Sequence, residues 1–403
     1  MRSIRANEPG QVKWRRWRQA YYITHVSNLE SIITQGIYSH SKVNDLGLRH
    51  APVYNEDVVN RRRARKTPAG RSLWDYANVY IHPRNPMLYT VVKKVGVEDV
   101  AVITVRRPMI YKNPAGAFIT DGNAASDDTE FFPLKDKREA FARLQDVDGL
   151  EFWKPEDGTK RRIMAELLVP DRIPSDWIDQ ISVGTDSGKT KVEALLAGVP
   201  TRPQVVVEPY MFFLPDVAAQ LTPNLSLVRG DMFFSGMQTL TVSVNTEGVM
   251  GRGLASRARY QFPDVYVQYE DLCKTRRLRM GRPFLYKRES ALDLQLADEP
   301  EQLDTPNSKT WFLIFPTKNS WRQPADKEGV IEGLDWLVAH YQEEGITSIA
   351  VPALGCGLGW LEWAVMGPIL CKKLAQLNIT TQLYLPAERP IPRDQLTPEY
   401  LLH

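Results

Sequence analysis

The sequence of 403 residues contains only three cysteines and six histidines. Cys273, Cys356 and Cys371 are widely separated, so they provide neither a disulfide framework nor a CxxC metal site. No apolar run approaches the roughly 18 residues of a membrane-spanning helix, and the basic start of the chain leads into no signal-peptide core. We therefore expect a cytoplasmic protein that is kept reduced, has no membrane partner and binds no metal.

Acidic residues are scarce in the N-terminal part of the chain. Residues 1–112 carry about twenty lysines and arginines against about eight acids, although the net charge of the whole chain is only +3. The remainder is therefore net acidic. This asymmetry makes the N-terminal part the candidate for contact with a polyanionic partner.

The densest basic run covers residues 61–66 and lies in a stretch that the pattern predicts to be helical. Aromatic and proline-rich residues follow it, with strands expected at residues 74–80 and 91–95. A basic patch beside aromatic side chains is typical of a surface that binds nucleic acid, a dinucleotide or both. A solvent-exposed helix face is the alternative, and the run alone does not decide between them.

A single acid, Glu166, interrupts the apolar run at residues 163–169. Carboxylates are rarely buried unless they are paired or functional. The same pattern fits a glutamate that points outward from a strand. The pattern leaves both interpretations open.

The second half of the chain changes character. Residues 195–224 are rich in proline and predict a boundary near residue 220. From Leu225 onward, short apolar strands alternate with helical stretches, which predicts parallel strands and crossover helices. Glycine-rich turns follow two of these strands, at residues 245–255 and 352–360. Backbone amides in two such turns can hold one phosphate-bearing ligand between them, and purely structural turns are the alternative.

A set of motifs occurs in a characteristic order along residues 18–210. These motifs are Tyr22-Ile23-Thr24-His25, Arg61-Arg62-Arg63, Asp75-Tyr76, the segment from Pro83 to Tyr89, and Ala165-Glu166-Leu167-Leu168-Val169. In the motifs and in their order this part resembles the DarT-type DNA ADP-ribosyltransferase toxins. The resemblance implies an α+β ADP-ribosyltransferase fold, in which a split mixed sheet grips NAD, and transfer of ADP-ribose from NAD onto a base of single-stranded DNA.

The resemblance also implies roles for individual residues. Glu166 matches the catalytic glutamate, which can stabilise an oxocarbenium-like centre or accept a proton from the attacking base. Arg62 matches the arginine of the active site, and Tyr22 stands where many relatives carry a histidine. Core packing is the alternative role for Tyr89 and Trp153. The residues expected at NAD are His25, Tyr22, Asn28, Arg62 and Tyr89, and those expected at DNA are Arg61, Arg63, Arg65 and Trp153.

A second set of motifs lies between residues 225 and 385. It comprises Gly230-Asp231, the segment 245–253, Phe315-Pro316-Thr317-Lys318 and the segment 352–359. These motifs resemble the macrodomain of DarG-type antitoxins, which remove ADP-ribose from DNA. The resemblance implies a three-layer αβα macrodomain with a mixed sheet, in which Asp231 binds the adenine and Asn245 the distal ribose. The loop residues expected around the diphosphate are Gly248, Gly251, Gly253, Leu354, Gly355, Cys356 and Gly357.

Lys318 matches the catalytic lysine of this branch. It stands at the end of an apolar strand, where partial desolvation would lower the pKa of its amine. A neutral amine there can attack the anomeric carbon of the ribose and form a Schiff-base-type intermediate. An exposed lysine at a strand end is the alternative.

Together the two resemblances predict a fused toxin and antitoxin that acts in phage defence. We expect a transferase domain at residues 1–215, a linker at 216–224, a macrodomain at 225–385 and a tail at 386–403. The expected ligands are NAD as a substrate, ADP-ribose and single-stranded DNA, and the two domains are expected to contact each other. Thymine is the expected target base and guanine the alternative. Modification of RNA or protein, and a macrodomain that only reads ADP-ribose, are the competing functions.

Overall fold

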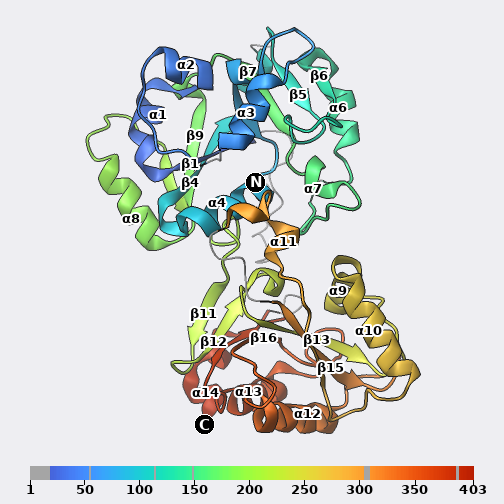
Figure 1. Cartoon of the computed structure of the whole chain (residues 1–403). Helices are drawn as coiled ribbons and strands as arrows, with labels where there is room; N and C mark the ends of the chain where they lie inside the picture. Colours follow the sequence, from blue (N-terminus) through green and yellow to red (C-terminus); the bar gives the residue numbers. More distant parts are fainter. Residues whose placement is uncertain (1–18, 54–55, 113–114, 148, 304–308, 387–389) are drawn as a thin grey trace, which may run out of the picture. The chain divides into compact units, whose positions relative to one another are not determined.

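The computed structural model describes residues 19–53, 56–112, 115–147, 149–303, 309–386 and 390–403. These residues form two compact units (Figure 1). The first contains residues 19–213 and also the segment 293–303. The second contains residues 214–292 and the described residues from 309 onward. We expected the segment 293–303 in the second domain, and the fold instead places it in the first unit.

The first unit is built on a mixed eight-stranded sheet with the order β10-β9-β4-β1-β3-β7-β5-β6. Its neighbouring strands are antiparallel except for β9 and β10, which are parallel. The strands are β1 (Gln19–His25), β3 (Tyr76–Tyr80), β4 (Val100–Arg106), β5 (Phe118–Thr120), β6 (Phe131–Pro133), β7 (Glu166–Pro170), β9 (Ile178–Val183) and β10 (Gln204–Val207). A separate ribbon pairs β2 (Ile37–Tyr38) with β8 (Arg172–Ile173).

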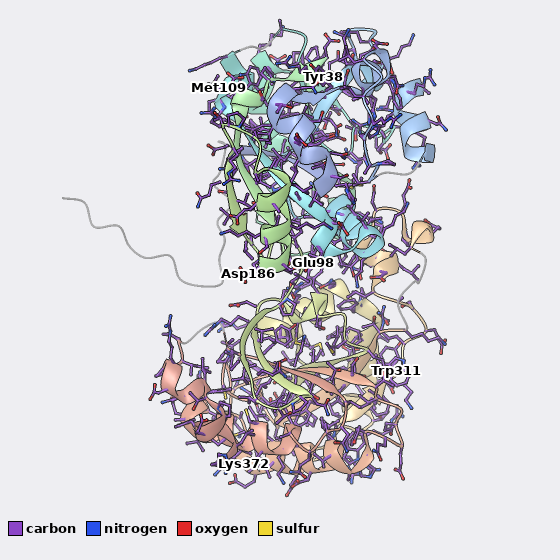
Figure 2. All side chains as sticks on the ribbon, turned by 90° about the vertical axis from the view of Figure 1, so that its left-hand side faces the viewer. Tyr38, Glu98, Met109, Asp186, Trp311 and Lys372 are labelled. Atoms are coloured by element: carbon purple, nitrogen blue, oxygen red, sulfur yellow. The ribbon has the colours of Figure 1, made fainter. Side chains whose placement is uncertain are left out.

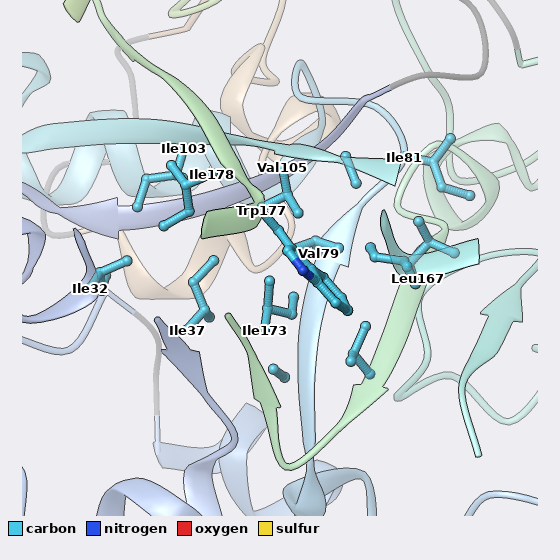
Figure 3. Packing of buried hydrophobic residues seen from close by; sticks show 14 of the residues in the cluster. Ile32, Ile37, Val79, Ile81, Ile103, Val105, Leu167, Ile173, Trp177 and Ile178 are labelled. Atoms are coloured by element: carbon cyan, nitrogen blue, oxygen red, sulfur yellow. The ribbon is translucent and has the colours of Figure 1, made fainter. Parts of the chain in front are cut away.

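The core of this unit lies between the sheet and short helices. Figure 3 shows Val79 of β3 and Leu167 of β7 facing Trp177, with Ile103 of β4 and Ile32 of α1 nearby. Burying such side chains stabilises the fold by roughly 1.5–3 kcal/mol each before the entropy of ordering them is subtracted. The helices are α1 (Leu29–Gln35), α2 (His40–Asp45), α3 (Glu56–Ala64), α4 (Pro86–Val95), α5 (Arg107–Lys112), α6 (Lys137–Arg143), α7 (Thr159–Arg162), α8 (Asp186–Leu195) and α11 (Asp293–Leu296).

Two of these helices show how local signals set their ends. The expected strand at residues 91–95 is instead the second half of α4, because Asn85 caps this helix by accepting a hydrogen bond from the Leu88 amide and Pro86 occupies its first turn. At α8, Thr185 caps the helix, and its hydroxyl donates to Glu98, which lies beside Asp186 in Figure 2. In α4, the capped first turn outweighs the strand preference of the short β-branched run at residues 91–95.

The second unit has three layers. Its seven-stranded sheet has the order β11-β12-β17-β16-β13-β15-β14, with parallel inner strands and antiparallel edges. Figure 1 shows α9 and α10 on one side of this sheet and α12, α13 and α14 on the other. The elements are β11 (Asp216–Gln220), β12 (Leu225–Arg229), β13 (Thr239–Asn245), β14 (Phe284–Tyr286), β15 (Trp311–Lys318), β16 (Ser348–Pro352), β17 (Thr380–Tyr384), α9 (Gly253–Gln261), α10 (Pro263–Lys274), α12 (Lys327–His340), α13 (Trp363–Leu374) and α14 (Pro398–Leu402). The three-layer αβα prediction is confirmed.

The ends of this unit differ from the expected linker and tail. Residues 216–220, expected within the linker, form β11, which pairs with β12. In the expected tail, Leu396 and Leu401 are buried in the core of the second unit. Polar residues and prolines around these segments give no sign of pairing in the sequence, because the hydrogen bonds and apolar contacts that hold them come from distant strands and helices.

Candidate functional sites

Glu166 is fully buried at the start of β7. Arg62 of α3 donates two hydrogen bonds to its carboxylate, from Nη1 to Oε1 at 3.1 Å and from Nη2 to Oε2 at 2.9 Å. The amide of Ala124 also donates to Oε1, at 2.9 Å. The Glu166 amide in turn donates to the Thr120 hydroxyl at 2.8 Å. The outward-facing interpretation of Glu166 is therefore wrong, because its oxygens are oriented by buried donors.

Arg62 differs from its neighbours because a helix turns by about 100° per residue. Arg62 is buried, whereas Arg61 and Arg63 are exposed on either side of it. Burial opposes the charge of Arg62, but Glu166 outweighs that effect and raises the pKa of the guanidinium. The three adjacent arginines therefore divide into one residue that holds the carboxylate and two that face outward.

Two residues beside Glu166 were not predicted from the sequence. Tyr80 lies opposite Glu166 in the pairing of β3 with β7, and burial together with the Glu166 carboxylate raises its pKa. Thr120 supports the Glu166 backbone from β5. Strand register brings both of them to the site, and no local motif marks either one.

The residues expected at NAD occupy different places. His25 ends β1, and its Nδ1 accepts a hydrogen bond from the Ser27 amide at 3.1 Å. Tyr21 pairs with Tyr80, so the strand register separates His25 from the Glu166 row by four residues, or about 13 Å. A single ligand that contacts both ends must be elongated, as a dinucleotide is. Tyr22 is half-buried on the same strand.

Asn28 and Tyr89 have structural partners. The side chain of Asn28 donates to the Ala51 carbonyl at 2.9 Å and accepts from the Ala51 amide at 2.8 Å, so it holds the loop at residue 51. Tyr89 is buried, and its hydroxyl donates to Asp293 at 2.5 Å. These contacts favour the packing alternative for Tyr89.

The residues expected at DNA also separate into two groups. Arg65 is tied to Asp127 at 2.6 Å and to the Thr129 carbonyl, so it braces the loop before β6. Trp153 is fully buried, and its indole N–H donates to the Leu296 carbonyl at 2.9 Å. The indole of Trp153 therefore packs inside the first unit in this structure, which favours the core alternative for this residue. Arg61 and Arg63 keep exposed guanidinium groups.

The segment 293–303 brings a carboxyl group close to this site. Burial raises the pKa of Asp298 to about 6, Lys160 opposes the shift, and Glu299, Arg61 and Glu166 also contribute. Because the pKa of the folded Asp298 carboxyl lies above its ordinary value of 3.8, this group stabilises the fold fully when the pH is below 3.8. The contribution is lost as the pH rises through 6. The ionised side chain is therefore unfavourable at neutral pH.

We expect Asp298→Asn to raise the melting temperature of the first unit at pH 7.5. A difference of one pKa unit corresponds to about 1.4 kcal/mol, and opening of the segment will reduce the full effect to about 1–2 kcal/mol. Thermal unfolding measured from pH 4 to pH 8 should show a difference between variant and wild type that grows with pH and levels off above pH 6. A difference that is the same at every pH would contradict this expectation.

In the second unit, Lys318 ends β15 and lies opposite Asn245 in the pairing with β13. Its amine donates to the Leu358 carbonyl at 3.3 Å. Burial lowers the pKa of the Lys318 amine from the ordinary lysine value. Lys318 is therefore neither a freely solvated lysine nor a fully buried one, and its amine lies between the loops that follow β13 and β16.

Asn245 shapes the first glycine-rich loop. Its side chain donates to the Val249 carbonyl at 2.7 Å and accepts from the Glu247 amide at 2.9 Å. The hydroxyl of Tyr269, a fully buried residue of α10, donates to the same Asn245 oxygen at 3.0 Å. Tyr269 was not predicted from the sequence, because only the packing of α10 brings it to the loop.

We expect Tyr269→Phe to weaken ADP-ribose binding about three- to tenfold, because a lost hydrogen bond that orients Asn245 is worth about 1 kcal/mol. Isothermal titration of free ADP-ribose would measure the change. Tyr266→Phe, on the same helix but with its hydroxyl on Glu270, is the matched control and should bind normally. Unchanged affinity in Tyr269→Phe would contradict the positioning role.

The two glycine-rich loops approach each other closely. Gly355 has a φ of +80°, and a Cβ there would meet Leu361 at 2.6 Å, so only glycine fits. A Cβ on Gly253 would meet Leu358 of the second loop at 3.1 Å. Asp231 follows β12, accepts a hydrogen bond from the Phe233 amide at 3.0 Å and forms an ion pair with Arg257 at 2.6 Å. The residues predicted to bind ADP-ribose therefore lie together at one end of the sheet, where its parallel strands have their carboxyl ends.

Among the described residues, no group of three or more histidine, cysteine or carboxylate side chains is arranged to hold a metal ion. Within the same residues, no helix has the length and apolar character needed to cross a bilayer.

The family model described as "ssDNA thymidine ADP-ribosyltransferase, DarT" matches residues 21–213. The chain is similar to the DNA ADP-ribosyl transferase–DNA ADP-ribosyl glycohydrolase fusion protein of Thermosipho africanus, with 46% identity over 96% of this chain and 99% of the relative. The solved structure of Thermosipho africanus DarTG in complex with ADP-ribose matches with a TM-score of 0.90, over 96% of this chain and all of that one.

A shorter match covers the second half of the chain. The DNA ADP-ribosyl glycohydrolase of Thermus aquaticus is 35% identical over 167 residues, which are 41% of this chain and 42% of that protein. The match to the Thermosipho africanus fusion protein spans both units and nearly the whole of each chain. The chain therefore belongs to the family of DNA ADP-ribosyl transferase–DNA ADP-ribosyl glycohydrolase fusion proteins.

Proposed function

We propose that this chain both attaches ADP-ribose to DNA and removes it. The first unit transfers ADP-ribose from NAD onto a base of single-stranded DNA, and the second unit hydrolyses the product. The observation that carries the proposal is the coexistence on one chain of a buried Glu166–Arg62 pair and a macrodomain edge with a partly desolvated lysine, Lys318. The family description supports thymidine as the target.

In the transferase, Glu166 is our candidate for the residue that acts on the nicotinamide ribose. As nicotinamide leaves, positive charge develops on the ribose, and a carboxylate fixed by Arg62 and the Ala124 amide stabilises it without having to reorganise. The base nitrogen then attacks the anomeric carbon and loses a proton, for which Glu166 is the acceptor. Arg62 acts as the positioning residue of this carboxylate.

In the macrodomain, Lys318 supplies the nucleophile. Its neutral amine attacks the anomeric carbon of the ADP-ribosyl group, and the bond to the DNA base breaks as the base takes up a proton. Water then hydrolyses the lysine adduct and releases ADP-ribose. The lowered pKa of Lys318 supports this role, because it increases the fraction of neutral amine near pH 8.

The exposed guanidinium groups of Arg61 and Arg63 are our candidates for contacts with DNA phosphates. We also propose that the protein acts in the cytoplasm, where genomic and phage DNA are accessible, and that the pair of activities serves phage defence. On this view the macrodomain limits the toxicity of the transferase by erasing its product.

The direct test uses Lys318→Ala, which leaves the transferase intact. This chain is incubated with NAD and short single-stranded oligonucleotides of varied base content, and mass spectrometry looks for one added ADP-ribose. An adduct on oligonucleotides that contain thymine, removed again by the wild-type chain, would support the proposal. Adducts only on RNA or on protein would overturn the DNA assignment.

A further inference from the structure

Exposed apolar side chains occur in the loops at the end of the sheet where Lys318 lies. Four large ones lie in the loops that follow β13, β15 and β16, which are Val249, Trp321, Leu358 and Trp360. The two indoles are 50% and 63% exposed. No other tryptophan among the described residues is as open to solvent as these two. Apolar groups that cluster on a surface mark binding sites more often than isolated ones do.

The loops that carry both indoles are hydrogen-bonded to Lys318 and to the first glycine-rich loop. Lys318 donates to the carbonyl of Leu358, two residues before Trp360. On the other side, the Trp321 amide donates to the carboxylate of Glu247, which belongs to the first glycine-rich loop. The Thr246 amide donates to the Asn319 carbonyl in the same region. The segments that carry the two indoles are therefore tied to Lys318 and to the loops predicted to bind ADP-ribose.

The backbone at Trp360 adds a second observation. Its φ is +64°, a conformation that costs a bulky residue about 1–2 kcal/mol and that glycine adopts readily. The chain keeps an indole at this position although the ring is mostly in water. At Trp321, the guanidinium of Arg322 lies 4.2 Å from the ring centre, so a cation accompanies the exposed indole.

The chemistry of the substrate indicates which part of it would contact these indole rings. With ADP-ribose in the glycine-rich loops, the bond to be broken lies at Lys318, and the DNA strand must continue outward from that point. We propose that Trp321 and Trp360 stack on the bases that flank the modified nucleotide, with Arg322 near a backbone phosphate. Aromatic rings beside cations are the usual means of holding unpaired nucleotides. This inference rests on the proposed glycohydrolase function and adds recognition of the single strand.

Two variants test the stacking, Trp321→Ala and Trp360→Gly, and the second keeps a residue that accepts the observed φ. The substrates are an ADP-ribosylated single-stranded nonamer and the same adduct on the mononucleoside. We expect each variant to raise KM for the nonamer about 5- to 150-fold, in line with about 1–3 kcal/mol per stacked base. The kcat, the turnover of the mononucleoside adduct and the affinity for free ADP-ribose should not change.

The matched control is Tyr400→Ala on α14, an aromatic residue of the same unit that is 36% exposed. It should behave as the wild type with both substrates. Equal losses on the nonamer and the mononucleoside would assign the indoles a purely structural role and overturn the proposal, as would no loss on either. Failure of the wild-type chain to cleave both substrates would instead overturn the glycohydrolase function itself.

A different observation concerns the acidic segment, defined here as residues 293–303. It packs on the first unit, with α11 beside α4 in Figure 1. The Tyr89 hydroxyl donates to Asp293 at 2.5 Å, and the Asp298 amide donates to the Thr90 hydroxyl at 2.9 Å. Glu299 forms an ion pair with Arg61, an exposed arginine next to the residue that holds Glu166.

We also infer that the acidic segment covers part of the surface that single-stranded DNA needs on the transferase. A carboxylate and a phosphate compete for the same guanidinium group. DNA that uses Arg61 must therefore displace Glu299, and the segment lowers the affinity of the transferase for DNA. This inference rests on the proposed transferase function.

Two substitutions in the acidic segment should act in opposite directions. Glu299→Lys replaces attraction to Arg61 by repulsion, and we expect two- to fivefold tighter binding of a fluorescent single-stranded oligonucleotide, since an exposed ion pair is worth up to about 1 kcal/mol. Asp298→Asn removes an unfavourable buried charge, which strengthens docking of the segment and weakens DNA binding at pH 7.5. Glu301→Gln, exposed on the same segment, is the control and should bind normally.

The measurements use the full chain with Lys318→Ala, so that no product is removed. Weaker binding in Glu299→Lys, or equal binding in all three variants, would show that the segment does not compete with DNA. An oligonucleotide that binds but is never modified in any variant would count against the transferase function and not against the competition.

Discussion

Lys318→Ala should abolish release of ADP-ribose from modified DNA and make the chain toxic to a bacterial host. Loss of a nucleophile typically lowers a rate by a thousandfold or more, and we expect a drop of at least about 10³ in single-turnover hydrolysis. The transferase is untouched, so adducts accumulate in genomic DNA. Growth after induction and the adduct content of DNA measured by mass spectrometry would record both effects.

The pH dependence of the wild-type hydrolase tests the same role. Attack requires the neutral amine, so the single-turnover rate should rise with pH and level off above the pKa of Lys318. Because burial lowers that pKa, the plateau should begin below the ordinary lysine value of 10.5. A rate that falls as the pH rises from 7 to 9 would be incompatible with an amine nucleophile.

Lys372→Ala is the matched control for the loss of a positive charge. Lys372 lies on the outer surface of α13 (Figure 2) and donates to the terminal carbonyl of His403. It should hydrolyse modified DNA at the wild-type rate and remain harmless. Full activity in Lys318→Ala would show that Lys318 is not the nucleophile. Toxicity in Lys372→Ala would contradict a role that is specific to Lys318.

Glu166→Gln should lower ADP-ribose transfer to single-stranded DNA by about 10³, which is the usual cost of removing one preorganised electrostatic group. Glutamine keeps the size of the side chain and an oxygen that accepts hydrogen bonds from Arg62 and the Ala124 amide, but it lacks the negative charge. In the Lys318→Ala background, this second change should restore growth. Transfer of label from radioactive NAD to an oligonucleotide would measure the rate.

The stability of Glu166→Gln has to be measured alongside its activity. Removing one partner of a buried ion pair leaves Arg62 buried without a counter-charge and can cost about 3–5 kcal/mol. Thermal unfolding and NAD binding of the purified variant would show whether it is folded. Glu139→Gln, on the exposed face of α6, is the control and should keep full activity. A folded Glu166→Gln that still transfers ADP-ribose at the wild-type rate would exclude the carboxylate from catalysis.

Much of the site follows from signals that are local in the sequence. Gly355 and Gly253 have positive φ values and stand between a strand and a helix, where glycine is the residue that a turn of this kind favours. Glu166 was identified because it is one acid in an apolar run and matches a family motif. In both cases a few adjacent residues contain the information, and the fold only brings the segments together.

Other features depend on contacts between distant segments. The family resemblance assigned Arg62 to the active site and Arg61 and Arg63 to DNA. Residue type alone does not distinguish the three arginines, because only the packing of α3 decides which guanidinium points inward. Trp153 has a side chain that could stack on a base. Its buried indole N–H instead donates a hydrogen bond to the carbonyl of Leu296, 143 positions later. Tyr269 reaches Asn245 only through the packing of α10.

The sequence by itself therefore predicted the two kinds of domain, the glycine-rich turns, and Glu166 and Lys318 as candidate catalytic residues, because each of these belongs to a short motif that resembles a known family. The tertiary structure alone decided that Glu166 is buried, that α3 points Arg62 at it, and that the segment 293–303 joins the first unit. These outcomes depend on burial and on pairing between residues far apart in the chain. They are set when distant apolar surfaces and opposite charges meet, and no short stretch of sequence contains that information.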